Sequence, residues 1–199
     1  MSFQMINVVT PGRAFIKNVV SALIGCCLIA GTAIGAEYQL SDKYDMYVDP
    51  AAKQQLGDKR YSELMAFFHE AEKAIETKDL NALMSLYSES YTDGEHDKKS
   101  AEAIWKRIFE TFDMTATRHN MMLVKVAADK NMVVFRCSGL LLGVPKPNSG
   151  MKQKNMITID NWALQDHVIV KESGQWKLIG TYGTERKRLW FDKPMHPLF

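Results

Sequence analysis

Acidic and histidine side chains gather in one short segment, residues 91–97, which reads Tyr-Thr-Asp-Gly-Glu-His-Asp. Its side chains that can ligate a metal or transfer a proton are Asp93, Glu95, His96 and Asp97. Such a cluster is common by chance, and it has no defined ligand spacing such as His-x-x-x-His. An Asp-Gly pair is also a frequent turn, and a run of charges is typical of a solvated loop. We therefore predict no metal site, and no phosphate-binding loop indicates a cofactor.

A second group of candidates lies on a long β-like segment, residues 156–171. Alternate side chains of a regular strand share one face, which would carry Asp160, Trp162, Asp166 and Val168. Trp162 and Asp166 would then lie on the same side of the sheet. A bulge near Trp162–Gln165 would reverse this parity, and both possibilities remain open.

Three helices are predicted to precede the strands. Their apolar residues recur every three or four positions, and they run from Lys59 to Lys78, from a cap at Asp79 to near Ser90, and from a cap at Ser100 to Phe112. Trp105 lies in the apolar stripe of the third helix and is predicted to be a core residue.

Beyond Thr115 the apolar period changes to two, which indicates strands. They are predicted at residues 121–126, 132–144, 156–171 and 176–182, with turns at 128–131 and 172–175 and a polar loop at 145–154. Trp176 and Cys137 are expected in the core. Helices followed by antiparallel strands predict an α+β domain.

The chain of 199 residues begins with a predicted signal peptide, residues 1–36. Arg13 and Lys17 precede an uncharged apolar stretch, which ends in the small residues that signal peptidase accepts. A retained membrane anchor and a lipid-modified Cys26 are the alternatives. Without this segment the chain holds 23 basic and 23 acidic residues, which is unlike a nucleic-acid binder. We expect a periplasmic or secreted protein with no membrane attachment after cleavage.

Three stretches resemble the nuclear transport factor 2-like (SnoaL-like) superfamily. They are ETKDLNALMSLYSESYTDG, KKSAEAIWKRIFETF and VIVKESGQWKLIGTY, in the order and spacing of that family, within residues 60–184. The resemblance implies a cone-shaped half-barrel: a strongly bent antiparallel sheet wrapped over three N-terminal helices, with a pocket at its wide end. It assigns residues 59–184 to this domain. The composition on either side predicts an N-terminal arm at 37–58 and an aromatic C-terminal tail at 185–199.

The resemblance also implies roles for particular residues. Enzymes of this family use an acid or base after the second helix, where Asp93 and Glu95 stand, while His119 matches a position near the pocket. His119 could polarise a carbonyl or hold a carboxylate, or it could simply be satisfied by backbone at a helix–strand junction. Asp166 could act as a protonated acid in an apolar site. Tyr91, Trp162 and His119 are the predicted ligand-binding residues.

Two functions of different class follow from the resemblance. The first is an exported binding or accessory protein that holds a small apolar molecule, or a protein partner, in the cone. The second is a cofactor-free isomerase, dehydratase or cyclase that uses a pocket carboxylate as general base. The aromatic tail is expected to pack over the sheet or onto a second subunit, which would make a homodimer.

Overall fold

The computed structural model describes residues 46–94, 96–152 and 155–182. Its helices are α1 (Ala51–Leu56), α2 (Asp58–Glu76), α3 (Leu80–Ser85) and α4 (Lys98–Thr111). Its strands are β1 (Tyr47–Val48), β2 (Tyr87–Asp93), β3 (His96–Asp97), β4 (Phe112–Val126), β5 (Met132–Pro145), β6 (Ile157–Glu172) and β7 (Gln175–Tyr182). The predicted signal peptide, most of the arm before β1, Glu95 and the aromatic tail lie outside the described residues. Within the described ranges, no helix is long and apolar enough to cross a membrane.

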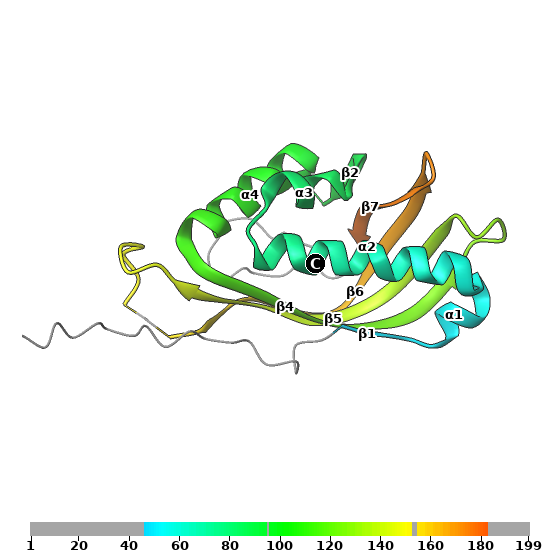
Figure 1. The fold of residues 1–199 in the computed structure, drawn as a ribbon, viewed down its shortest axis with the longest axis horizontal. Coiled ribbons are helices and arrows are strands. Elements are labelled where there is room, and N and C mark those ends of the chain that lie inside the picture. Colours follow the sequence, from blue (N-terminus) through cyan, green and yellow to red (C-terminus); the bar gives the residue numbers. More distant parts are fainter. Residues whose placement is uncertain (1–45, 95, 153–154, 183–199) are drawn as a thin grey trace, which may run out of the picture. The chain divides into compact units, whose positions relative to one another are not determined.

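The strands form one mixed sheet in the order β1-β4-β5-β6-β7-β2-β3. Strands β4 to β7 are antiparallel neighbours, whereas β1 joins β4 and β2 joins β7 in parallel. Figure 1 shows the sheet bending around α2, α3 and α4, which lie on one side of it. We call this helix-covered side the inner face and the opposite side the outer face. The predicted α+β class is confirmed.

The core forms where α2 packs on the inner face. Apolar side chains of α2 recur at helical spacing and are buried, namely Leu64, Phe67, Phe68, Ala71, Ala74 and Ile75. The ring of Phe68 lies 6.0 Å from that of Phe135 on β5, in an edge-to-face arrangement. At the C-terminal end of α2, Thr115 of β4 donates a hydrogen bond to the carbonyl of Ile75. These contacts fix which face of β4 and β5 points inward.

Helix α4 is fixed at both ends. At its start, the Asp97 side chain accepts from the backbone N–H of Ser100, while the Ser100 hydroxyl accepts from the N–H of Asp97. The predicted cap at Ser100 is therefore three residues too late, because Asp97 supplies the acceptor and Ser100 returns the bond. The hydrogen bonds from Ser100 hold the pKa of Asp97 below its usual range.

At the other end of α4, two lysines from elsewhere in the chain donate hydrogen bonds to backbone carbonyls. Lys146 Nζ donates to the carbonyl of Phe109 at 3.2 Å, and Lys78 Nζ donates to that of Phe112 at 3.3 Å. Positive charge at a helix C-terminus also interacts favourably with the helix dipole. The C-terminal end of the helix is thus held by partners from elsewhere in the chain, whereas its start is capped locally.

The second predicted helix is shorter than expected. Helix α3 ends at Ser85, and β2 (Tyr87–Asp93) already occupies residues 87–90, where the helix was expected to continue. The physical reason is a distant partner: Tyr87 pairs with Leu178 of β7, whose N–H donates to the carbonyl of Leu86. A stripe of apolar residues cannot distinguish a last helical turn from a buried strand.

Strand β4 begins nine residues earlier than predicted. Phe112 follows α4 directly and already has extended backbone angles, so the chain passes from helix to strand without a loop. The expected strand start at Met121 is where β1 pairs with β4. At this edge the N–H of Asp49 donates to the carbonyl of Met121, and the Asp49 side chain accepts from Leu123.

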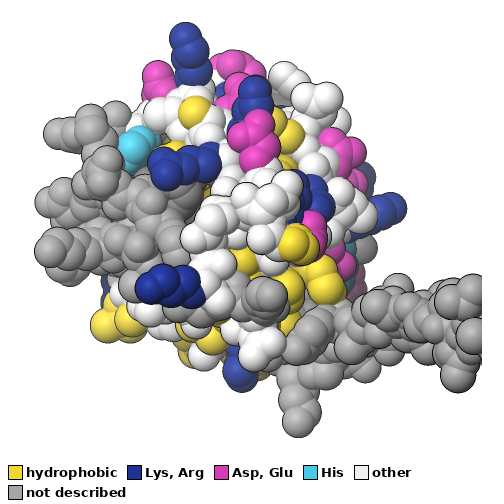
Figure 2. Space-filling model, turned by 90° about the vertical axis from the view of Figure 1, so that its left-hand side faces the viewer, with side chains coloured by type: hydrophobic (Ala, Val, Ile, Leu, Met, Phe, Trp, Pro, Cys, Tyr) yellow, Lys and Arg dark blue, Asp and Glu magenta, His cyan; other side chains and the backbone are white. Residues whose placement is uncertain are grey.

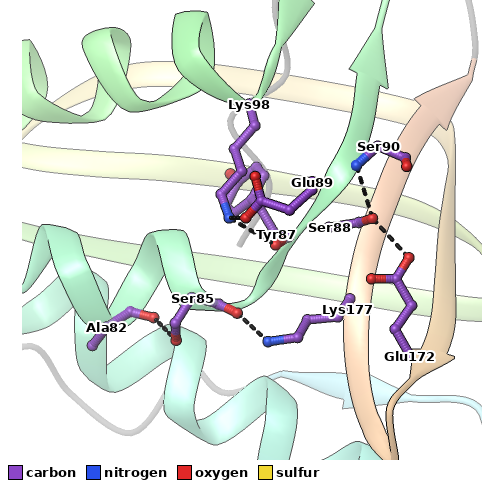
Figure 3. A network of polar contacts seen from close by, with 9 residues as sticks. All are labelled: Ala82, Ser85, Tyr87, Ser88, Glu89, Ser90, Lys98, Glu172 and Lys177. Atoms are coloured by element: carbon purple, nitrogen blue, oxygen red, sulfur yellow. Dashed lines mark hydrogen bonds and ion pairs between the residues drawn. The ribbon is translucent and has the colours of Figure 1, made fainter.

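A polar network attaches β2 to its neighbours (Figure 3). Ser88 donates to Glu172 at the end of β6 at 2.7 Å and accepts from the N–H of Ser90. Lys98 of α4 donates to the Tyr87 carbonyl at 3.2 Å and pairs with Glu89 at 2.6 Å. The network holds β2 beside β7 and brings residues 91–93 to the rim of the inner face.

Over the face drawn in Figure 2, basic and acidic side chains are interspersed rather than separated by sign.

Candidate functional site

A β-bulge in β6 decides which side chains face the helices. Gln165 pairs with Cys137 and Trp162 pairs with Gly139, so two residues of β6, 163 and 164, oppose one residue of β5. Leu164 has a positive φ of 57°, and its N–H donates to the Ser138 hydroxyl. The predicted bulge is confirmed at this place. It reverses the side-chain parity of β6 beyond residue 164.

Asp166 is consequently on the outer face, away from Trp162. Both oxygens of Asp166 bind the guanidinium of Arg136, at 2.7 Å to Nε and 2.9 Å to Nη2. The prediction that Asp166 shares a face with Trp162 is wrong, because the bulge turns Asp166 to the outer face and brings Gln165 and His167 to the inner face. The two hydrogen bonds to Arg136 hold Asp166 on the outer face, away from the apolar site in which it was expected to act as an acid.

His119, Cys137 and Trp162 meet on the inner face, one from each of β4, β5 and β6. Trp162 Nε1 donates to Cys137 Sγ at 3.2 Å, and Cys137 Sγ lies 3.5 Å from His119 Nδ1. The rings of His119 and Trp162 are 5.2 Å apart. All three side chains are buried. The sequence named His119 and Trp162 as candidates, and the structure places them together.

Gly139 makes this arrangement possible. A Cβ atom at Gly139 would lie 2.4 Å from an indole carbon of Trp162 and 2.3 Å from the carbonyl oxygen of Arg118. Only a residue without a side chain therefore allows the indole to lie across β5 at this point. Two features therefore direct the Trp162 indole toward His119: the space at Gly139 and the hydrogen bond to Cys137.

Burial raises the pKa of the Cys137 thiol to about 12. The thiol therefore keeps its proton and is not a nucleophile, unlike the cysteine of a Cys–His catalytic pair. Its S–H can donate to His119 Nδ1 or to the Ser138 carbonyl, 3.6 Å away. When it donates to His119, the imidazole is neutral and carries its proton on Nε2.

The inner face holds further buried polar side chains. They are Thr117 on β4, Asp160, Gln165 and His167 on β6, and Thr181 on β7. Among the described residues, the hydroxyls of Thr117 and Thr181 have no hydrogen-bond partner. Asp160 accepts from the N–H of Asn161 at 2.9 Å. Gln165 and His167 were missed because the sequence parity placed them outside. The only sequence signal for them was the possible bulge.

Tyr91 and Asp93 lie on β2, near the opposite edge of the sheet from β4. Tyr91 is buried, and its ring packs edge-on against Tyr87, which accepts a hydrogen bond from Trp105 Nε1 at 2.8 Å. Asp93 is half-buried and pairs with His96 across the turn. Its neighbour Thr92 pairs with Gly180 of β7. Of the two acids predicted after the second helix, Asp93 is half-buried on β2, and Glu95 lies outside the described residues.

No three His, Cys, Asp or Glu side chains gather into a possible metal site within residues 46–94, 96–152 and 155–182. His96, the histidine of the acidic segment, instead contacts Ser100 at the start of α4 through Nδ1, at 3.2 Å. What the inner face offers is a set of hydrogen-bonding groups and an indole, arranged on four strands beneath the helices.

No family model and no curated protein matches the sequence. Solved structures do match. A proposed scytalone dehydratase from Novosphingobium aromaticivorans is 12% identical, with a TM-score of 0.50 over 64% of this chain and 85% of that one. A proposed dehydratase of the NTF2-like family from Streptomyces avermitilis is 12% identical, with a TM-score of 0.46 over 63% and 95%. Bd1075 of Bdellovibrio bacteriovorus is 14% identical, with a TM-score of 0.48 over 63% of this chain but only 41% of its own.

At these identities the likeness concerns the fold alone. The alignment with the Novosphingobium protein covers most of that chain, and it agrees with the bent sheet and helices described above. The resemblance seen in the sequence is thereby confirmed at the level of architecture. This chain shares its fold, a bent sheet wrapped over helices, with the Novosphingobium protein.

Proposed function

We propose that the protein binds a small, largely apolar molecule on the inner face of its sheet, beside Trp162 and His119. The observation that carries this proposal is the number of polar side chains buried there, on β4, β6 and β7. A sheet face that serves only as a core is apolar, whereas ligand sites combine apolar walls with a few convergent polar groups.

The roles of the individual groups follow from their chemistry. The indole of Trp162 offers a flat apolar surface, and its orientation is fixed by Cys137 and Gly139. His119 can exchange a hydrogen bond with a carbonyl or carboxylate of the ligand. The hydroxyls of Thr117 and Thr181 can donate or accept, so they suit a ligand with one or two polar atoms. In the exported, processed protein this binding would take place in the periplasm or outside the cell.

The proposal is tested with the protein purified from cells that express the full chain. Titration with 8-anilinonaphthalene-1-sulfonate, an apolar aromatic anion, should quench tryptophan fluorescence. Trp162→Phe should weaken the binding of this probe about fivefold, roughly 1 kcal/mol, because it removes part of the aromatic surface. Trp176→Phe is the matched control, since Trp176 is equally buried but packs beside Lys171. Equal affinities of the two variants would argue against a site at Trp162.

One observation favours an enzyme as the second candidate. Asp160 is a buried carboxylate on the same face as Trp162, and Asp93 is half-buried at the rim. A carboxylate in such surroundings can serve as the general base of an isomerase, dehydratase or cyclase. The test is deuterium incorporation beside the carbonyl of cyclohex-2-enone in D2O. Incorporation that is lost in Asp160→Asn, but not in Asp166→Asn on the outer face, would support catalysis.

A further inference from the structure

Strand β6 extends beyond its neighbour β7 at one end. β6 has 16 residues and β7 has 8. The two strands pair from Glu172 opposite Gln175 to Asp166 opposite Tyr182, which is the last described residue of β7. Among the described residues, β5 is the strand that pairs with positions 157–165 of β6. We call the side of these positions that faces away from β5 the 157–165 edge, against which a further strand can lie.

The 157–165 edge includes a deeply buried carboxylate. Asp160 is 3% exposed and Trp162 is 4% exposed, and both lie on the inner face. A carboxylate is costly to bury, and a cation that lies beside it offsets that cost. A positively charged side chain that arrives along this edge would therefore stabilise the folded chain.

The segment that follows β7 starts at this edge and carries such charges. Residues 183–199 lie outside the described residues, and they begin next to Tyr182, opposite Asp166. Their sequence holds three successive basic residues, 186–188, and then the apolar run Leu-Trp-Phe at 189–191. An extended chain advances about 3.3 Å per residue, so residues 183–191 match the length of the 157–165 edge.

We propose that residues 183–191 continue β7 along the 157–165 edge and place Lys187 against Asp160. Opposite charges on neighbouring strands stabilise their pairing. The same strand would also bring apolar side chains to the covered inner face, which agrees with the apolar run that follows the basic residues.

The register of the last described pair leads to Lys187. Thr181 pairs with His167, and both side chains are buried on the inner face. Side chains alternate along a strand, so those of residues 183, 185, 187, 189 and 191 would also face inward. On β6 the bulge adds one residue, which makes residues 165, 162 and 160 the successive inward positions. Residue 183 thus meets residue 165, residue 185 meets Trp162, and Lys187 meets Asp160.

The added strand would form a wall of the ligand site, a consequence that rests on the proposed function. Leu189 and Phe191 would extend the apolar surface next to Asp160. An aspartate paired with Lys187 is less suited to be a general base, so the pair would favour binding over catalysis. The strand itself does not require a ligand, and it can be tested without one.

Trypsin tests the pairing, because it cleaves after lysine and arginine. In protein purified from cells that express the full chain, cleavage after Arg188 should be about tenfold or more slower than after Lys152, which is exposed in the loop between β5 and β6. Lys187→Met and Asp160→Asn should each speed cleavage after Arg188 about fivefold, since each removes one partner of the pair. Asp113→Asn, exposed on β4, is the matched control and should leave the rate unchanged.

The double variant shows whether Lys187 and Asp160 act together. Lys187→Met with Asp160→Asn should be cleaved no faster than the faster single variant, because both changes remove the same pair. Rates that multiply, or equal cleavage after Arg188 and Lys152 in the parent protein, would overturn the proposal. Protection that falls on about tenfold dilution would also overturn it, since another copy would then supply the strand.

Two controls separate these results from other failures. Lys73 lies within α2, so cleavage there reports unfolding of the whole chain rather than release of residues 183–191. No ligand is present in the digestion, so protection after Arg188 does not depend on whether 8-anilinonaphthalene-1-sulfonate binds beside Trp162. Probe binding without protection would reject the added strand and leave the proposed function standing, and protection without probe binding would do the reverse.

Discussion

At the scale of single residues, the protonated thiol of Cys137 limits the chemistry that the inner face can perform. Cys137 is protonated, and it is hydrogen-bonded to Trp162 and beside His119. A protonated, buried thiol cannot start nucleophilic catalysis, but it can hold an imidazole in one tautomer and an indole in one orientation. Because these side chains are already fixed, less conformational entropy is lost when a ligand binds beside them. The cluster is thus better suited to positioning than to covalent chemistry.

The raised pKa of Cys137 predicts a specific loss of stability at high pH. The folded state holds the thiol proton up to about pH 12, whereas the unfolded chain releases it near its ordinary pKa of 9.0. The stabilisation is therefore complete below about pH 9 and declines above it, by about 1.4 kcal/mol per pH unit while only the unfolded state ionises. Urea unfolding between about pH 8 and 10.5 should show this slope, and Cys137→Ala should lack it.

The same property can be checked with an alkylating reagent. Cys137 should resist iodoacetamide at pH 8 while folded and react in urea, because only an exposed thiolate is a nucleophile. Rapid labelling of the folded protein at Cys137 would mean that the thiol is open to solvent, and the expected pH slope would then have no basis.

At the scale of elements, two irregularities position the site. The bulge at Leu164 turns Gln165 and His167 inward, and Gly139 leaves room for the Trp162 indole. Neither feature adds a functional group of its own. Each changes the side to which functional groups on the same strands are directed, which is the usual effect of a bulge beside a site.

Gly139→Ala is predicted to destabilise the protein by about 1–3 kcal/mol, since the added methyl has no space. One of its close neighbours is the backbone oxygen of Arg118, which cannot move without shifting β4. Thermal unfolding would measure the loss. Trp162→Phe in the same chain should recover only part of it, because the contact with Arg118 remains. A melting temperature equal to that of the parent protein would contradict the close packing at this crossing.

Lys146→Met should cost about 0.5–1.5 kcal/mol, because it removes a charge and a donor from the C-terminal end of α4. Chemical unfolding is the appropriate measurement. Lys106→Met is the control, since Lys106 is exposed in the middle of the same helix and makes no such contact in the described structure. Equal losses for the two variants would show that the Phe109 carbonyl gains nothing from Lys146.

At the scale of the whole molecule, the sheet has an unusual distribution of side chains. Its covered inner face holds histidines, threonines and a carboxylate, while its uncovered outer face exposes methionine, valine and leucine. The inner face is otherwise apolar, with Phe135, Leu141 and Ile169 in the core, so its polar groups are the departure from an ordinary core face. The buried polar groups on the inner face are the observation behind the proposal that this face receives a ligand.

Export is predicted from the sequence, and it is tested by intact mass. The mature protein should begin at Ala36 or Glu37, because small residues close the apolar stretch of the leader. Mass spectrometry of the periplasmic fraction would show this directly. A full-length mass would indicate a retained anchor, and a lipid adduct beginning at Cys26 would indicate a lipoprotein.

Much of the fold could be predicted from the sequence, since it depends on local patterns. Apolar spacing placed α2 and α4, the change to a period of two placed the strands, and Trp105 and Trp176 are buried as expected. Even the bulge near Trp162–Gln165 was anticipated. Periodicity, turn residues and a family-like order of motifs act over a few residues, so they can be recognised without the rest of the chain.

The site was decided by tertiary structure. Whether residues 87–90 continue a helix or form a strand depends on β7, which lies some ninety residues away in sequence. Asp166 and His167 exchanged faces because one extra residue at the bulge reverses every later side chain, and only pairing with β5 shows where that residue is. Cys137, expected as a plain core thiol, contacts His119 and Trp162 because three strands align. Pairing between distant strands sets which groups meet, and no local pattern records it.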